Sequence, residues 1–136
     1  MGESIMNESV FKTHPIIPNI NISCLFDLVS LKNRKDIAID SLDLEASYQN
    51  LVDDSVVMAK AFRELGIKKN DIVCISMPNV YQAVAAFFAL NRIGACTTFL
   101  NSFSSEDEII HYLNEFESPI FINYDKNYDY NNIIKK

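Results

Sequence analysis

Apolar residues recur at steps of three and four between Ser47 and Gly66. The positions that share this spacing are Tyr48, Leu51, Ser55, Met58, Phe62 and Leu65. Such spacing places side chains along one side of an α-helix, and charged residues such as Asp53 and Arg63 fall on the other side. Ser47 is a favourable N-cap residue, and Gly66 suits the position just past a helix end. The pattern predicts an amphipathic surface helix.

Two strand patterns and a second helix pattern follow. Residues 72–77 are apolar on both faces apart from Ser76, as in an interior strand of a parallel sheet. After a turn at residues 78–79, residues 80–90 are nearly all apolar, which predicts a helix buried on most sides by further chain or by a partner. Residues 96–101 form another strand pattern. This order predicts an α/β fold with a parallel-sheet βαβ unit and right-handed crossovers.

The segment after residue 101 contains a capping-box sequence, Ser105-Glu106-Asp107-Glu108. The helix that follows is expected to turn four apolar residues inward: Ile109, Ile110, Leu113 and Phe116. Residues 120–122 form a last strand pattern after Pro119. This segment therefore adds a further helix and strand to the α/β pattern.

The segment before residue 47 is predicted to hold a short helix and a hairpin. Ser23 is expected to cap the helix, whose apolar face comprises Leu25, Phe26, Leu28 and Val29. Residues 37–39 and 44–46 are expected to pair around a turn at Leu42-Asp43. Both elements lie in front of the main helix.

Composition along the chain suggests three parts. Residues 1–22 contain Pro15 and Pro18 and show no period, so we expect an extended N-terminal arm. Residues 23–125 hold the α/β pattern and are expected to form one subdomain. Residues 126–136 are rich in Asn, Asp, Lys and Tyr, and are expected to begin a further element that is truncated.

Composition and charge narrow the classes of partner. The chain has 136 residues, 49% of them hydrophobic and 22% charged, which is ordinary for a globular protein. The formal net charge of −6 disfavours nucleic acid and anionic membranes as partners. No window approaches the roughly eighteen apolar residues of a transmembrane helix, and no signal peptide is visible.

Three cysteines, Cys24, Cys74 and Cys96, lack the spacing of a metal or redox motif. Cys74 and Cys96 fall in strand patterns, where a free cysteine usually behaves as a small buried hydrophobe. An odd number of unpaired thiols fits a reducing compartment, so we expect a cytoplasmic protein.

A search for a phosphate-binding loop finds none in this sequence. The three glycines, Gly2, Gly66 and Gly94, cannot form a dinucleotide fingerprint or a P-loop. Asn79 stands at a predicted helix N-cap, where free N–H groups could receive an anion, although plain capping explains it more simply. Gly66 and Gly94 are better explained as helix ends.

Other chemistry-bearing residues also lack partners at the right spacing. His14 and His111 have no second His or Cys at zinc-ligand distance along the chain. Ser102, Ser104 and Ser105 lack the context of a nucleophilic serine. The acids 106–108 are explained by a helix start. From the residues alone we predict no catalytic, cofactor-binding or metal-binding residue.

Residues 23–125 nevertheless carry a series of landmarks in a definite order. Two landmarks belong to the first long helix: its start, Ser47-Tyr48-Gln49-Asn50-Leu51, and its exit, Glu64-Leu65-Gly66-Ile67-Lys68-Lys69-Asn70-Asp71-Ile72-Val73. A turn follows at Pro78-Asn79, and the second helix ends at Arg92-Ile93-Gly94-Ala95. The next strand ends at Thr98-Phe99-Leu100-Asn101-Ser102. Segments 105–113 and 121–125 complete the series. Together these landmarks resemble the N-terminal part of an adenylate-forming, AMP-binding enzyme of the acyl-CoA synthetase type.

Three residues depart from the pattern of that family. Asn70 replaces the usual Gly before Asp71, Phe99 replaces a Pro, and Ser102 replaces another Pro. The first change is conservative, because Asn tolerates a positive φ better than most residues. The other two affect local loop geometry.

The resemblance implies a two-step reaction for a full-length enzyme. A carboxylate attacks the α-phosphate of Mg·ATP to give an acyl-adenylate, and a thiol, often coenzyme A, then takes the acyl group. The family's SGTTGxPKG loop, nucleotide-binding motifs and late catalytic lysine are absent from this sequence. Only scaffold positions carry over: Tyr48, Pro78, Asn79, Gly94 and Asn101. The resemblance thus implies binding of ATP, Mg and coenzyme A by the full-length enzyme and not by this chain alone.

Three hypotheses follow from the sequence. The first is an inert N-terminal fragment of such a ligase, whose partner is the remainder of the enzyme. The second is a non-catalytic α/β module that binds another protein. The third is an unrelated Rossmann-like nucleotide-binding domain, which the lack of a glycine fingerprint disfavours. In the first case an uncovered apolar face would favour a homodimer of the fragment.

Overall fold

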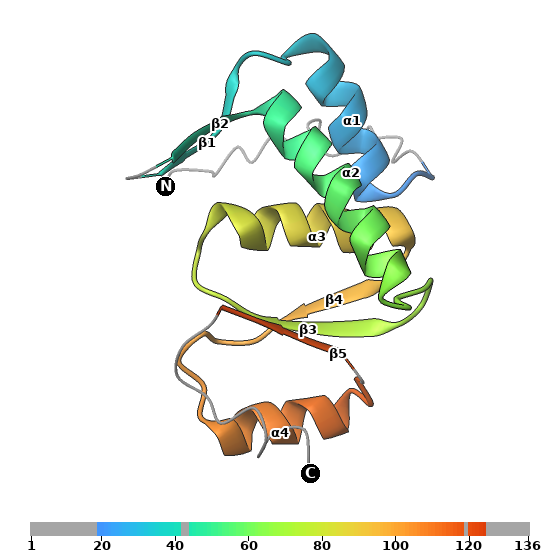
Figure 1. Cartoon of the computed structure of the whole chain (residues 1–136), viewed down its shortest axis with the longest axis vertical. Coiled ribbons are helices and arrows are strands. Elements are labelled where there is room, and N and C mark those ends of the chain that lie inside the picture. Colours follow the sequence, from blue (N-terminus) through green and yellow to red (C-terminus); the bar gives the residue numbers. More distant parts are fainter. Residues whose placement is uncertain (1–18, 42–43, 119, 125–136) are drawn as a thin grey trace, which may run out of the picture.

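The computed structural model describes residues 19–41, 44–118 and 120–124. Its elements, in chain order, are α1 (Ile22–Lys32), β1 (Ile37–Ser41), β2 (Leu44–Ser47), α2 (Tyr48–Glu64), β3 (Ile72–Ser76), α3 (Tyr81–Ile93), β4 (Cys96–Phe99), α4 (Glu106–Glu115) and β5 (Ile120–Asn123) (Figure 1). The predicted α/β fold is confirmed. The hairpin turn, Pro119 and most of the two terminal segments lie outside the described residues, so the three-part division stays a prediction.

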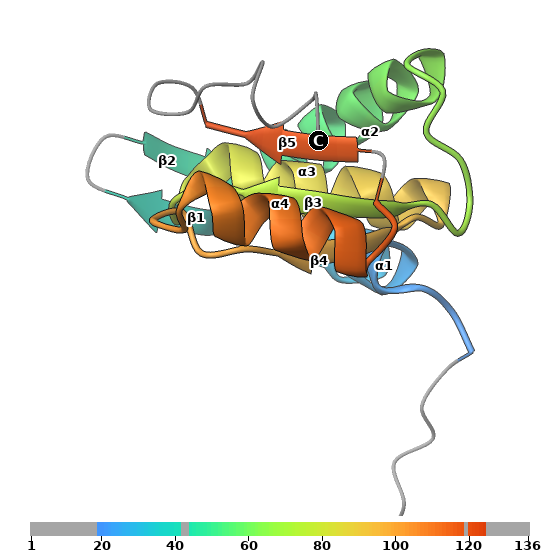
Figure 2. The ribbon, with the colours of Figure 1, turned by 90° about the horizontal axis from the view of Figure 1, so that it is seen from below.

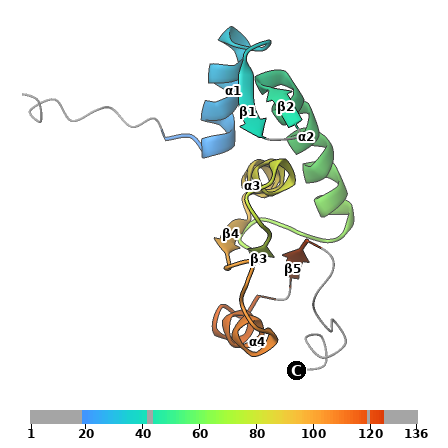
Figure 3. The same ribbon diagram turned by 90° about the vertical axis from the view of Figure 1, so that its left-hand side faces the viewer.

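The parallel sheet has the strand order β4-β3-β5. Its central strand, β3, pairs in parallel with β4 from Ile72 to Ile75 and with β5 from Val73 to Ser76. Helix α3 covers one face of the sheet and α4 covers the other (Figures 2 and 3). Consecutive crossovers therefore run on opposite faces, and β3 is enclosed on every side. The predicted interior strand is confirmed.

Alternating side chains of β3 build two cores. Val73 and Ile75 are fully buried in the larger cluster, which lies toward α3 and includes Leu90. Cys74 is fully buried on the other face, in a smaller cluster with Ile109 of α4. This alternation follows from the period of two residues along a strand.

Helix α3 is buried between the sheet and the helices before it. Ala85, Ala86 and Ala89 are almost fully buried, and these small side chains let neighbouring elements approach closely. Figure 1 shows α1 and α2 lying over the side of α3 that faces away from the sheet. The predicted burial of this helix is confirmed, and its cover comes largely from this same chain.

A polar clamp joins the three helices above the sheet. Arg92 near the end of α3 donates from Nη1 to Asp27 Oδ2 of α1 at 2.6 Å, and its Nη2 contacts the other carboxylate oxygen. Its Nε donates to Ser55 Oγ of α2 at 2.9 Å. Because the Arg92 side chain is only 15% exposed, loss of a partner would leave its charge poorly solvated. The clamp fixes α1 and α2 on α3.

Three helix ends follow the sequence signals. Ser47 and Asn50 form a capping box at the start of α2, and Ser105 and Glu108 form another at the start of α4. Gly94 ends α3 in the left-handed region at φ 86°, as the predicted helix end requires. Hydrogen bonding of the free backbone N–H and C=O groups at the helix ends therefore sets these boundaries.

The first helix differs from its prediction. Asn21 caps α1, because its side chain accepts from Cys24 N, and Ser23 lies buried inside the helix. Leu28 is 57% exposed, and Leu25 and Val29 are exposed too. Phe26 alone of the expected face turns inward, and its ring stacks on that of Phe88 with centroids 4.2 Å apart. The expected apolar face was therefore wrong, because the docked side of α1 is set by Phe26 and by the clamp.

Three further expectations were wrong. The N-cap of α3 is Val80, without a side-chain cap, so Asn79 does not cap this helix. Leu65 lies just past the end of α2 and is 79% exposed. Cys96 is exposed at the start of an outer strand, whereas Cys74 is buried as expected. Burial raises the pKa of the Cys74 thiol, which keeps it in the neutral form.

A matched pair of leucines tests the position of the core. Leu90→Ala should lower the free energy of unfolding by about 2–5 kcal/mol, because Leu90 is fully buried beside β3. Leu65→Ala, the same change at an exposed position, should cost less than about 0.5 kcal/mol. Urea denaturation of both variants measures the difference. Equal losses would show that α3 does not lie over the sheet as described.

Candidate functional site

The carboxyl ends of β3 and β4 lie where the chain departs to opposite faces of the sheet. After β3 the chain enters α3, and after β4 it enters α4 on the other face (Figure 3). Open α/β sheets bind ligands beyond the carboxyl ends of strands at such a divergence. This position is therefore the first place to seek a site.

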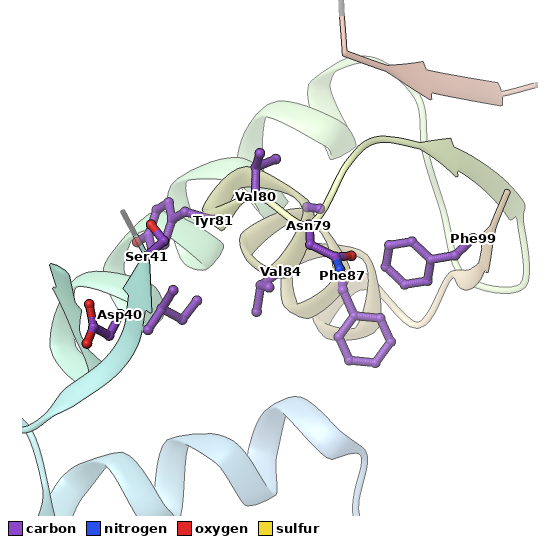
Figure 4. A pocket seen from close by; sticks show the side chains of 10 residues that line it. Asp40, Ser41, Asn79, Val80, Tyr81, Val84, Phe87 and Phe99 are labelled. Atoms are coloured by element: carbon purple, nitrogen blue, oxygen red, sulfur yellow. The ribbon is translucent and has the colours of Figure 1, made fainter. Parts of the chain in front are cut away.

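A groove of about 560 Å³ opens there, between the β1–β2 hairpin and the first half of α3 (Figure 4). Its apolar wall consists of Ile39, Val80, Ala83, Val84, Phe87 and Phe99. Its polar atoms come from Asp40, Ser41, Asn79 and Tyr81. The volume falls within the range of about 300–1,000 Å³ that is typical of small-molecule sites.

Tyr81 forms one end of the groove and is tied to α2. Its hydroxyl donates to Asp54 Oδ2 at 2.7 Å. Burial, together with the neighbouring carboxylate of Asp54, raises the pKa of Tyr81 well above its usual value. The phenol therefore stays protonated at neutral pH, and its proton is already engaged by Asp54.

The scaffold positions predicted from the sequence are not gathered into one site. Asn79 lines the groove, and Pro78 precedes it in the loop after β3. Tyr48 begins α2, where its ring stacks on Phe26 with centroids 5.7 Å apart. Gly94 lies at the opposite end of α3. Tyr48 therefore has a local packing role, and Gly94 has a role in the turn that ends α3.

Asn101 and Asn70 stabilise turns. The Asn101 side chain accepts from Phe103 N at 2.9 Å, and its carbonyl accepts from Ser76 Oγ at 3.3 Å, which ties the loop after β4 to β3. Asn70 adopts a positive φ of 72°, as expected for a residue in place of glycine. Its N–H donates to the Gly94 carbonyl at 3.0 Å. These contacts join the turns before β3 and after α3.

The remaining candidate residues keep structural roles or lie outside the described residues, as His14 does. His111 is exposed on α4, with its Nε2 3.4 Å from Glu115 Oε2. Ser105 and Glu108 are occupied in the α4 capping box. Among the described residues, no group of three His, Cys, Asp or Glu side chains is arranged to hold a metal ion. The described helices are also too short or too polar to cross a bilayer.

Sequence reasoning missed the groove itself. In the sequence, Phe87 is one of many apolar residues of a predicted helix, and Phe99 is noted only because it replaces a Pro of the family pattern. Hairpin residue Ile39 is separated from them by more than forty positions along the chain. The signal that could have found the site is the rule that ligands bind at the carboxyl ends of diverging strands.

Comparison with known proteins decides the family. A family model described as "AMP-binding enzyme" matches residues 28–136. The chain belongs to the AMP-binding enzyme family. Its parallel sheet and covering helices form an N-terminal α/β part of such an enzyme, as the order of landmarks from Ser47 to Asp125 indicates.

Curated relatives of the chain include acetyl-coenzyme A synthetases. The chain is 40% identical to that of Vibrio cholerae over 65 residues, which covers 47% of this chain and 10% of the relative. It is 32% identical to that of Coprinopsis cinerea over 82 residues, covering 60% of this chain and 12% of the relative. The chain thus matches about a tenth of the length of these relatives.

Solved structures agree on the fold. A mutant coronafacic acid ligase from Pectobacterium brasiliense superposes with a TM-score of 0.79 at 26% identity, covering 85% of this AMP-binding family chain and 23% of that chain. The N-terminal subdomain of NpsA from Klebsiella oxytoca gives a TM-score of 0.75 at 23% identity, covering 79% of this chain and 27% of that one. Both align with only a part of a larger chain.

Asn70 offers a test of the turn where this chain departs from the pattern of its family. Asn70→Gly should change the free energy of unfolding by less than about 0.5 kcal/mol, because glycine adopts a positive φ without strain. Asn70→Ala should cost about 1–2 kcal/mol, because Ala lacks that freedom. Asn114→Ala, the same replacement in the exposed face of α4, should be nearly neutral. Thermal unfolding that ranks Ala above Gly at position 70 would contradict the described turn.

Proposed function

We propose that this chain is the N-terminal scaffold of an ATP-dependent acyl- or aryl-CoA synthetase-like ligase. In that reaction a carboxylate oxygen attacks the α-phosphorus of ATP, and pyrophosphate leaves. A thiol sulfur then attacks the acyl carbon, and AMP leaves as the thioester forms. The observation that carries the proposal is the family match over residues 28–136. It favours this reading over an unrelated binding module or a Rossmann-like domain.

The chain itself contributes scaffold and no reacting group in this proposal. The groove does not fit Mg·ATP or coenzyme A, because its ten lining residues include no Arg, Lys or His to meet phosphate oxygens. Gly66 and Gly94 both have positive φ because they lie at the ends of helices, and neither belongs to a phosphate-binding loop. Binding of ATP, Mg and coenzyme A is therefore assigned to the remainder of the ligase.

The remainder of the enzyme is also the proposed partner of the exposed apolar surface. On α1, Leu28 and Leu31 are 57% and 59% exposed, and Phe103 after β4 is 92% exposed. Water contact with such side chains is unfavourable, so we assign their cover to later parts of the large domain. The homodimer expected from an uncovered apolar face stays a prediction, because α1 and α2 cover α3 while these other apolar side chains remain exposed. We place the enzyme in the cytoplasm, as its free thiols suggest.

Pyrophosphate exchange tests the proposal that this chain contributes no reacting group to the ligase. The chain alone, assayed over a panel of carboxylic acids, should leave exchange of labelled pyrophosphate into ATP at background. The acetyl-coenzyme A synthetase of Vibrio cholerae, assayed with acetate, serves as the active control. Exchange above background that depends on added acid and on this chain would show that it carries reacting groups of its own. In that case the scaffold proposal fails, while membership of the family stands.

A further inference from the structure

The groove described above presents two aromatic rings to an open space. The Phe87 and Phe99 rings are tilted by 33° with centroids 6.1 Å apart. Phe99 is 53% exposed, so much of its surface remains available for contact. Figure 4 shows Val84 beside them on α3. Aromatic rings favour offset or edge contacts at about this spacing, so a third ring can extend the pair.

The charge of the groove restricts what can enter it. Its lining includes one carboxylate, Asp40, and no basic side chain. Figure 4 shows the Asp40 carboxylate turned away from Phe87 and Phe99. An anion seated against the rings would be desolvated without a counter-ion, which is costly. An ammonium group there would also lack a nearby carboxylate, so an uncharged ligand fits best.

One polar group is placed to orient such a ligand. Asn79 lies at the groove and is exposed, and it does not cap α3. In Figure 4 its carboxamide lies on the same side of α3 as the two phenylalanine rings. A carboxamide both donates and accepts, so it pairs best with an amide or a hydroxyl. Few, well-placed polar groups in an apolar wall are what small-molecule sites use for orientation.

We propose that this groove binds an uncharged aromatic ligand that carries one amide or hydroxyl group. The ring lies against Phe87, Phe99 and Val84, and the polar group pairs with the Asn79 carboxamide. The lining residues offer no basic side chain that would pair with a carboxylate or a phosphate group. The proposal concerns this chain's own residues and stands whether or not the chain acts within a ligase.

Benzamide is the probe for the test, with benzoate as its charged counterpart of the same size. Titration of the isotope-labelled chain, followed by amide chemical shifts, should give saturable shifts confined to residues 79–84, Phe87 and Phe99. A ligand of this size should dissociate with a constant on the order of 1 mM. Benzoate should bind at least about fivefold more weakly, because its carboxylate gains no partner in the groove.

Two valine variants separate the groove from the rest of the surface. Val84→Arg places a long charged side chain in the groove and should abolish saturable benzamide shifts. Val57→Arg makes the same change on α2, where Val57 is 68% exposed and does not line the groove, and should leave binding unchanged. Asn79→Ala should weaken benzamide about threefold or more while leaving benzene binding unchanged. Spectra of each free variant confirm that it is folded.

Four results would overturn the proposal. The first is the absence of saturable shifts in the groove. The second is benzoate binding as tightly as benzamide, which would reveal an anion site. The third is a change of the same groove shifts with protein concentration and without any probe, because the occupant would then be a second copy of this chain. Loss of benzamide binding in Val57→Arg as well would likewise show that the groove is not its site.

Discussion

Enclosure of β3 is the constraint on which the rest of the structure depends. Its backbone is hydrogen-bonded to β4 on one side and to β5 on the other. Its side chains alternate between the clusters under α3 and α4, and Val73, Cys74 and Ile75 are fully buried. Moving this strand by one residue would exchange its two faces and mismatch the packing of both cores. Strand β3 therefore fixes the positions of both helices and of both outer strands.

The position of α3 on that strand determines what the remaining helices do. Buried alanines let α3 lie close to the sheet, and Arg92 at its end holds Asp27 of α1 and Ser55 of α2. The start of the same helix and the end of β4 border the groove. One end of α3 thus anchors the helical layer, and the other end shapes the candidate site. This arrangement is consistent with the scaffold role proposed for the chain.

Local signals were enough to predict most of the elements, whereas contacts between distant segments were not. The caps at Ser47 and Ser105 and the left-handed turn at Asn70 depend on neighbours within a few residues, so the sequence reveals them. The docked side of α1 depends on Arg92, 65 positions from Asp27, and periodicity carries no information about such a pair. The groove escaped prediction for the same reason. It forms only when the hairpin, α3 and the end of β4 come together.

Amide hydrogen exchange measures the dependence of the fold on β3 most directly. The amides of residues 73–76 are enclosed by both neighbouring strands and both helices, so they should exchange only through global unfolding. Their opening free energies should therefore equal the free energy of unfolding obtained with urea. The β1–β2 hairpin, which pairs outside the main sheet, should exchange much faster. Exchange of residues 73–76 as fast as that of the hairpin, in a chain that remains folded, would contradict the central position of β3.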